Sequence, residues 1–291
     1  MAKPVLHARD HLPGGSDPIA GLPIGSGTGG GTYWELVTGL ASLIAYWPLS
    51  DTAAPALDLS GNALHLDDED GTPTYLQAGP LTGTVYPYAV AFNGTSGTAP
   101  PGFREALART TGATAFDLSG GDPFTLEAWV YLASYDAGYI ASSMYQLGGG
   151  LSTIRLEVGS SLASPGQVIF KGVTTSETLN LSEWIHVAAT FDGTTARIYF
   201  NGAEVESGAG NSEASGSGAV YLGGGFFSGS GQYTALQGRL AHAAVYSDAL
   251  TAGEIAAHAA ATTSSEPAGY VWTADGVGGT SWEAPTIEVT Y

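Results

Sequence analysis

The chain has 291 residues, 44% of them hydrophobic, so it can build a substantial core as one large β domain or as two smaller domains. Its 8 basic and 27 acidic residues give a net charge of −19, which excludes the phosphate backbone of a nucleic acid as an expected partner. The absence of cysteine excludes disulfides, thiolate metal sites and thiol nucleophiles, and no apolar run approaches the ~20 residues needed for membrane insertion.

The first 21 residues form an N-terminal arm, which a glycine-rich linker over residues 22–32 separates from the rest of the chain. Glycine has no Cβ and leaves such a linker a large backbone entropy to lose on ordering, so the arm is expected to be flexibly joined. The first residues lack the apolar stretch of a signal peptide, so assembly in a cytoplasm is expected.

Two histidines in the arm, His7 and His11, are four residues apart. On a helix they would lie on one face, and a threefold axis would bring six imidazoles together at a metal ion. Pro13 would end that helix at once. The favoured interpretation is therefore that these histidines, with Asp10 and Asp17, make docking or oligomer contacts.

The body of the chain, residues 33–261, alternates apolar and polar residues in short runs bounded by turn residues. Over Phe124–Leu132 one face is apolar, whereas the other carries Glu127, Trp129 and Tyr131. Many short strands of this kind predict a two-sheet sandwich. Further strands are expected at Leu43–Trp47, Tyr86–Phe92, Thr153–Val158, Trp184–Phe191, Ala196–Phe200, Ala219–Leu222 and Leu240–Tyr246.

Turn and capping residues mark the remaining elements. Asp192-Gly193 and Asn201-Gly202 provide the positive φ that tight turns require. Thr251 and Glu254 form a capping box that predicts a short C-terminal helix. A second short helix is predicted after Pro101, where Phe103 would share a face with Leu107 and Glu105 would pair with Arg109.

Several short sequence motifs follow one another in the order found in the laminin G-like, concanavalin A-like jelly-roll family, and this resemblance covers nearly all of residues 40–261. The motifs are Ala45-Tyr-Trp-Pro-Leu49, Asp58-Leu-Ser-Gly-Asn62, Ala91-Phe-Asn-Gly94, Phe124-Thr-Leu-Glu-Ala-Trp-Val130, Trp184-Ile-His-Val-Ala-Ala-Thr-Phe-Asp-Gly193, Tyr199-Phe-Asn-Gly202 and Gly238-Arg-Leu240. The resemblance implies a curved all-β sandwich that in relatives binds glycans or proteins, often near calcium, and in a distant branch hydrolyses β-glucans. An activity must still be argued from the residues present.

Catalytic residues are not expected. The hydrolase branch places two glutamates around an aspartate on one strand, and this chain has no Glu-x-Asp-x-Glu sequence. The acidic run Asp67–Asp70 is interpreted as a solvated loop. His186, His242 and His258 have no serine in a nucleophile motif beside them, and His186 is interpreted as a packed or edge residue of a strand.

No cofactor is expected, and the calcium site of relatives is in doubt. The resemblance places acidic ligands after the glycine of the last strand motif, where this chain has Ala241 and His242. Asp58 and Asn62 are the remaining candidate calcium ligands, although turn capping is their favoured role.

Aromatic side chains in loops are the candidates for glycan binding, because rings stack on sugar faces and amides or hydroxyls bind the sugar hydroxyls. The alternative, which is favoured, is that they cap the rim of the sandwich or contact another subunit. Trp47, Trp129 and Trp184 are interpreted as core. The candidates are Tyr135, Tyr139, Tyr145, Gln146, Phe226, Phe227 and Tyr233.

The C-terminal segment, residues 262–291, is glycine-rich and carries Tyr270, Trp272 and Trp282. It resembles the tail G-Y-V-L-T-A-D-G-x-G-G-x-x-W at the ends of modules in bacteriophage virion proteins. The arm from His11 to Ile19 resembles an H-x-x-G-G-x-D-P-[IL] motif of phage tail fibres and other virion appendages. Both ends are therefore predicted to dock, with Trp272 and Trp282 buried against a neighbouring chain.

These observations predict a structural protein of a tailed phage, assembled in the host cytoplasm and located on the virion. Its partners would be other virion proteins and a cell-surface glycan, and a homotrimer is the favoured oligomer. Location on head or tail stays open, as does the choice between adhesion to glycans and capsid decoration. The alternatives are a bacterial surface or secreted carbohydrate-binding module and a diverged glycoside hydrolase.

Overall fold

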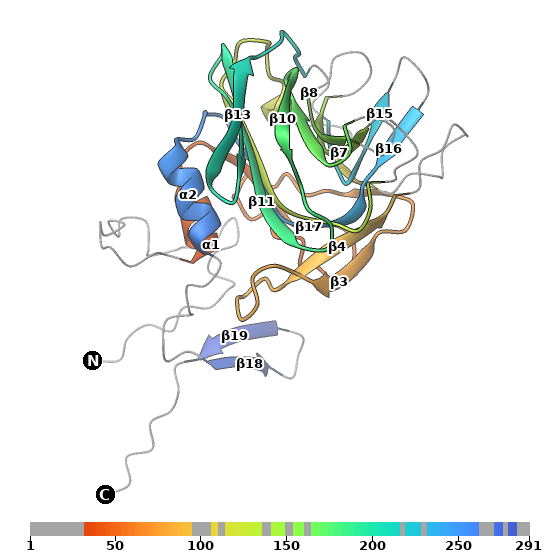
Figure 1. Cartoon of the computed structure of the whole chain (residues 1–291). Coiled ribbons are helices and arrows are strands. Elements are labelled where there is room, and N and C mark those ends of the chain that lie inside the picture. The colour runs from red at the N-terminus through yellow and green to blue at the C-terminus, as the bar shows by residue number, and fades with distance from the viewer. Residues whose placement is uncertain are drawn as a thin grey trace, which may run out of the picture.

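The computed structural model describes residues 32–94, 106–109, 114–135, 141–148, 154–159, 164–215, 219–227, 232–261, 271–275 and 279–283. Over most of this range the chain forms two antiparallel sheets packed face to face (Figure 1). The sandwich predicted from the alternating runs is confirmed.

The first sheet has eight strands, and its two central strands are β6 and β17. The long strand β17 pairs on one side with β6 and on the other with β4 and then β1. The strands in order are β13 (Ala203–Ala209), β12 (Thr195–Phe200), β11 (Trp184–Phe191), β6 (Phe124–Leu132), β17 (Gln237–Tyr246), β4 (Tyr88–Asn93) and β3 (Thr74–Ala78), with β1 (Leu43–Trp47) beside β17.

Within the described residues the second sheet has seven strands, and two further strand pairs are hydrogen-bonded to neither sheet. The seven strands in order are β10 (Val173–Thr178), β9 (Gln167–Phe170), β8 (Ile154–Gly159), β7 (Ala141–Leu147), β14 (Val220–Leu222), β5 (Ala106–Arg109) and β2 (Asp68–Asp70). The separate pairs are β15 (Gly224–Phe227) with β16 (Gln232–Ala235), and β18 (Val271–Asp275) with β19 (Gly279–Glu283).

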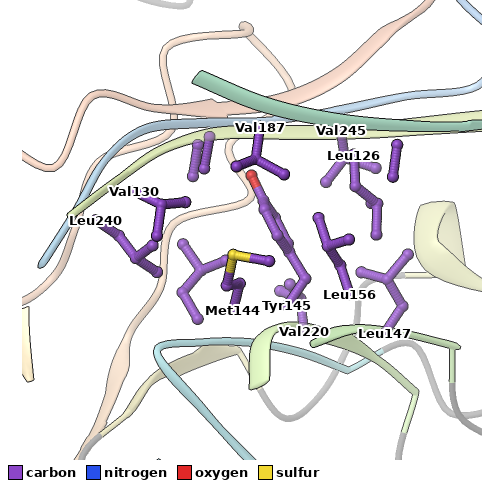
Figure 2. Close-up of a cluster of buried hydrophobic side chains, with 14 of the residues drawn as sticks. Leu126, Val130, Met144, Tyr145, Leu147, Leu156, Val187, Val220, Leu240 and Val245 are labelled. Carbon is purple, nitrogen blue, oxygen red and sulfur yellow. The ribbon is translucent and has the colours of Figure 1, made fainter. Parts of the chain in front are cut away.

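The core lies between the sheets and follows from the alternation of side chains along each strand. Leu126 and Val187 of the eight-stranded sheet meet Leu156 and Val220 of the seven-stranded sheet, and all four are fully buried (Figure 2). Such interdigitated apolar side chains supply most of the free energy of folding.

Two helices, α1 (Tyr33–Thr38) and α2 (Ala252–Ala260), pack against the other face of the eight-stranded sheet (Figure 1). Each begins with a capping box, Thr32 with Glu35 and Thr251 with Glu254, which satisfies backbone donors that the first turn leaves free. The predicted C-terminal helix is confirmed, whereas α1 was not expected because its first residues lie beside the glycine-rich run. A 3-10 helix, η2 (Thr114–Phe116), completes the described elements.

Most predicted strands agree with the structure, and β6 and β11 agree at both ends. The helix predicted after Pro101 is wrong at its described end, where Ala106–Arg109 is strand β5. Leu107 is buried in the core and β5 pairs with both β14 and β2. Pairing with neighbouring strands overrides the i,i+4 spacing that indicated a helix.

The acidic run is also not a simple solvated loop, because Asp68–Asp70 is the edge strand β2. Asp67 lies just before it, 3.0 Å from Nη1 of Arg109. Charged residues on an edge strand oppose pairing with another chain, which explains why a strand can have this composition.

Candidate functional site

Tyr145 was one of the candidates for glycan binding, and its burial in the structure contradicts that role. Its side chain is fully buried and points from β7 across the core toward the eight-stranded sheet (Figure 2). Its hydroxyl donates to the backbone oxygens of Glu127 and Ala244. A bulge between Ser143 and Tyr145 shifts the alternation of β7 at this point, which the sequence does not reveal.

Tyr135 takes the alternative role that the sequence left open, as a cap on the rim of the sandwich. It is half-buried against the core, and its hydroxyl donates to the backbone oxygen of Leu179 at 2.6 Å. A side chain at Gly166 would collide with the ring of Tyr135. Tyr139 lies outside the described residues.

Gln146 lies on the outer face of the seven-stranded sheet, the face directed away from the core. It stands directly opposite Arg155 of β8 on one side and Tyr221 of β14 on the other. The neighbours of Arg155 and Tyr221 along their strands point into the core, so alternation directs these two side chains outward. Three strands thus place a guanidinium, an amide and a phenol in one row.

A second row beside the first is formed by Ser143 and Glu157, which also face each other across β7 and β8. The hydroxyl of Ser143 lies 3.4 Å from Oε1 of Glu157, and Nη1 of Arg155 lies 3.6 Å from the same oxygen. Burial raises the pKa of the Glu157 carboxyl, and the charge of Arg155 opposes this rise. We call Ser143, Gln146, Arg155, Glu157 and Tyr221 the outer-face cluster.

The hairpin of β15 and β16 lies against this cluster. A Cβ at Gly225 of β15 would collide with the amide oxygen of Gln146 and lie 3.0 Å from the hydroxyl of Ser143, so the hairpin backbone approaches closely only because glycine stands there. Both Gln146 and Ser143 are fully buried, while Arg155 and Tyr221 are half-buried.

Three candidate glycan-binding residues belong to this hairpin. Phe226 and Phe227 are in β15 and Tyr233 is in β16, where Phe226 stands directly opposite Tyr233. The backbone thus brings them close to Gln146, whose own candidacy is contradicted by its full burial, as for Tyr145. The remaining members of the outer-face cluster were missed, although the alternation predicted for Thr153–Val158 already placed Arg155 and Glu157 on one face.

Asp58 and Asn62 act in the turn that follows β1. Oδ1 of Asp58 accepts from the backbone N–H groups of Tyr46 and Ser60, and Oδ2 accepts from Leu64 N–H. Nδ2 of Asn62 donates to the backbone oxygen of Ile44. The carboxylate of Asp58 is thereby occupied by protein donors, which is the turn-capping role. Within the described ranges no group of three or more His, Asp or Glu residues is arranged to hold a metal ion.

The three histidines considered for a catalytic triad surround one buried carboxylate, Glu127 of β6. Nδ1 of His258 lies 3.0 Å from Oε2 of Glu127, and Nε2 of His186 lies 3.4 Å from the same oxygen. His242 lies beside them against the ring of Tyr33. Glu127 and His186 are 0% exposed and the other two histidines 2%, so a substrate cannot reach them in this conformation.

The docking residues fall at the ends of the chain. His7, Asp10, His11, Asp17 and Tyr270 lie outside the described residues. Trp272 of β18 and Trp282 of β19 stand directly opposite each other in the C-terminal hairpin. Their predicted burial against a neighbouring chain stays a prediction. In the described part of the chain, neither helix is long and apolar enough to cross a membrane.

Comparisons with solved structures identify folds of the same kind. Trypanosoma rangeli sialidase in complex with 2,3-difluoro-KDN has a TM-score of 0.54 and 15% identity, over 88% of this chain and 38% of that chain. The binding domain of botulinum neurotoxin DC in complex with rat synaptotagmin II has a TM-score of 0.51 and 11% identity, over 78% and 52%. A botulinum neurotoxin type C structure gives the same values.

This chain therefore spans about a third of the sialidase and half of the toxin domains, and at these identities the likeness concerns the fold alone. No curated protein matches the sequence. Residues 108–256, just over half of the chain, match the family described as the concanavalin A-like lectin/glucanases superfamily. With its two antiparallel sheets and this match, the chain belongs to the concanavalin A-like lectin/glucanase superfamily.

Proposed function

We propose that the sandwich is a glycan-binding domain and that the outer-face cluster, with the β15–β16 hairpin beside it, is its binding surface. The observation that carries the proposal is the half-buried pair Arg155 and Tyr221, which stand on either side of the fully buried Gln146 across three adjacent strands. A guanidinium and a phenol provide donors and a ring face on one surface, which a hydroxyl-rich ligand requires, whereas the amide of Gln146 lies beneath the hairpin.

The aromatic residues Phe226, Phe227 and Tyr233 lie within the two paired strands of this hairpin and stay candidates for stacking on a sugar. A related fold makes the proposal reasonable, since the cell entry of botulinum neurotoxin type C depends on interaction with two ganglioside molecules. The argument for this chain depends on its own residues.

We infer binding without hydrolysis. A glycosidase requires two carboxyl groups about 5–10 Å apart, one as acid and one as nucleophile or base. Strands β7, β8 and β14 together contribute one carboxylate, Glu157, whose neighbours are Arg155 and Ser143. Outside these strands, Glu213 lies near enough for its charge to raise the pKa of Glu157, so hydrolysis has to be tested directly. Release of reducing sugar from a laminarin-like glucan would overturn this inference and revive the hydrolase alternative.

A glycan array with the intact protein tests binding, and substitutions on the outer face test the site. Arg155→Gln and Tyr221→Ala should each weaken binding about tenfold, as expected for the loss of one or two hydrogen bonds to a ligand. Arg197→Gln is the matched control, because Arg197 pairs with Asp192 at 2.7 Å on the other sheet. Unchanged glycan binding by both outer-face variants would contradict the proposed site. The absence of binding by the wild-type protein would contradict the proposed function.

We further propose that this domain is displayed on a tailed-phage virion and that the arm and the C-terminal segment attach it, in a trimer, to other virion proteins. The support is the pair of phage-like motifs at the two ends and the C-terminal hairpin that aligns Trp272 with Trp282. The protein should co-purify with particles and lose assembly when residues 1–21 or 265–291 are deleted.

A stable monomer that is indifferent to both deletions and absent from particles would contradict the virion proposal. If such a monomer still bound glycans, the protein would instead be a bacterial surface or secreted carbohydrate-binding module. The glycan-binding and virion proposals therefore fail independently.

A further inference from the structure

Glu127 and the groups around it form a buried polar cluster between the eight-stranded sheet and the two helices. The carboxylate comes from β6, His186 from β11 and Tyr246 from β17, and the hydroxyl of Tyr246 donates to Oε1. Tyr33 of α1 reaches the same oxygen at 3.5 Å, and His258 of α2 approaches both oxygens at 3.0–3.1 Å. These five residues are the Glu127 cluster.

The cluster holds both helices at one point. Tyr33 is the first residue of α1 and follows the N-terminal arm and linker, while His258 is in the last turn of α2, just before the C-terminal segment. The two segments that flank the sandwich are therefore both joined to it next to the Glu127 cluster. A change in the cluster changes how these segments are held.

His242 makes the contact between the two helices and the sheet sensitive to pH. Its Nδ1 lies 2.7 Å from the hydroxyl of Tyr46, whereas its buried Nε2 has no hydrogen-bond partner. Its backbone oxygen accepts from Tyr33 at 3.4 Å, and the rings of Tyr33 and His242 are 5.0 Å apart. His242 has a φ of 52° in the bulge of β17 that places it there.

The groups that face His242 from neighbouring elements do little to stabilise a proton on its Nε2. They are Tyr46 of β1, Tyr33 of α1, Glu127 of β6, His186 of β11 and the backbone oxygen of Tyr86. Glu127 already accepts from Tyr246 and contacts His258. Burial lowers the pKa of His242 to about 3, and the Tyr86 oxygen and Glu127 offset only part of this effect.

We propose that the Glu127 cluster and His242 form an acid-released clamp, which holds α1 and α2 on the sheet near neutral pH and frees them in mild acid. An open state that exposes His242 to water takes up a proton below the ordinary histidine pKa of about 6.5, whereas the closed state does not. Each pH unit below that value therefore shifts the closed-to-open ratio by up to about tenfold.

Hydrogen exchange of the full chain, with labelling times corrected for pH, tests this proposal. Between pH 6.5 and pH 5 the protection of the α1 and α2 amides should fall about 15-fold, because at pH 6.5 half of the open state already carries the proton and the tenfold limit per unit is reached only at lower pH. The amides of β6 and β11 should stay at least tenfold better protected at every pH. Equal protection of helices and strands would mean that only global unfolding occurs, and this would overturn the clamp.

His242→Asn is the decisive variant, because asparagine does not titrate and tolerates the left-handed backbone at this position. It should leave helix protection independent of pH over this range. The control His65→Asn, at a histidine that accepts from Asp58 N–H, should keep the wild-type pH dependence. Helix protection that still falls about 15-fold in His242→Asn would overturn the proposal, and the wild-type series alone decides if this variant does not fold.

Discussion

The hydroxyl of Tyr145 crosses the core and donates to backbone oxygens of the opposite sheet, at Glu127 and Ala244. In Tyr145→Phe these oxygens lose a donor that water cannot replace, so we expect the free energy of unfolding to fall by about 1–2 kcal/mol. Urea denaturation measures this change. Glycan binding should stay unchanged, because the hydroxyl points away from the outer face.

Tyr88 provides the comparison for that measurement, since it is 43% exposed. Tyr88→Phe should change stability by less than about 0.5 kcal/mol, as is usual for surface substitutions. If the two variants lost equal stability, the hydroxyl of Tyr145 would have no special role in joining the sheets.

Glu127 is a second residue whose importance comes from burial. Burial alone would raise the pKa of its carboxyl, but the charge of His258 and hydrogen bonds from both histidines outweigh this, so the pKa lies below its ordinary range. Glu127→Gln removes the charge and leaves the imidazolium of His258 without a counter-ion. We expect a loss of about 3–5 kcal/mol in the free energy of unfolding, the usual cost of breaking a buried ion pair.

Glu204→Gln is the matched control for Glu127→Gln. Glu204 is 42% exposed in its side chain and lies 3.9 Å from Nε of Arg197, so removal of its charge should cost less than about 1 kcal/mol. Urea denaturation of both variants at pH 7 compares the loss in free energy of unfolding at the buried carboxylate with the loss at the exposed one. Similar losses would show that the Glu127 cluster contributes no more than a surface pair.

At the scale of elements, the turn between β12 and β13 supports α2. Gly202 has a φ of 84°, and a Cβ there would lie 2.9 Å from the Cα of Ala256 in α2. Gly202→Ala therefore adds a clash with the helix to the strain of a positive φ. We expect it to cost at least about 1 kcal/mol more than Gly61→Ala, whose φ of 91° gives similar strain with nothing within 4 Å. Thermal unfolding compares the two, and equal losses would contradict the contact.

The strands that the sequence predicted well are those with one apolar face. β6 and β11 alternate cleanly and each pairs with a strand on both sides, so the pattern and the pairing agree. Edge strand β13 was not predicted, because most of its residues are exposed and little apolar alternation remains. Helix α1 has the same capping box as α2 but only six residues, too few for a periodic signal.

The outer-face cluster shows where sequence reasoning about the site ends. Alternation along β8 predicts that Arg155 and Glu157 share a face, but not that Ser143 and Gln146 stand opposite them. That depends on strand register, which the bulge in β7 sets. The contact between Glu127 and His258 depends in the same way on where helix α2 packs, and the alternation of residues along the strands does not determine that position.

At the scale of the whole molecule, two buried histidines should limit stability on opposite sides of neutral pH. Burial lowers the pKa of His242 to about 3. The unfolded chain then binds a proton that the folded chain does not, so stability falls as the pH decreases from about 6.5 toward 3. The loss is at most roughly 1.4 kcal/mol per pH unit, or about 2 kcal/mol at pH 5.

His258 acts in the opposite direction. Burial lowers its pKa, but the charge of Glu127 and the hydrogen bond that His258 donates to it raise the pKa more, so the folded value lies above 6.5. Its contribution to stability is complete below pH 6.5 and is lost as the pH rises through the folded value. Stability should therefore be greatest near pH 6.5, with a decrease on both sides. Urea midpoints between pH 4 and pH 9 measure this curve, in which His242→Asn should flatten only the acid side. A wild-type curve that rises steadily from pH 5 to pH 9 would contradict the assignment of His258 as the charged partner of Glu127.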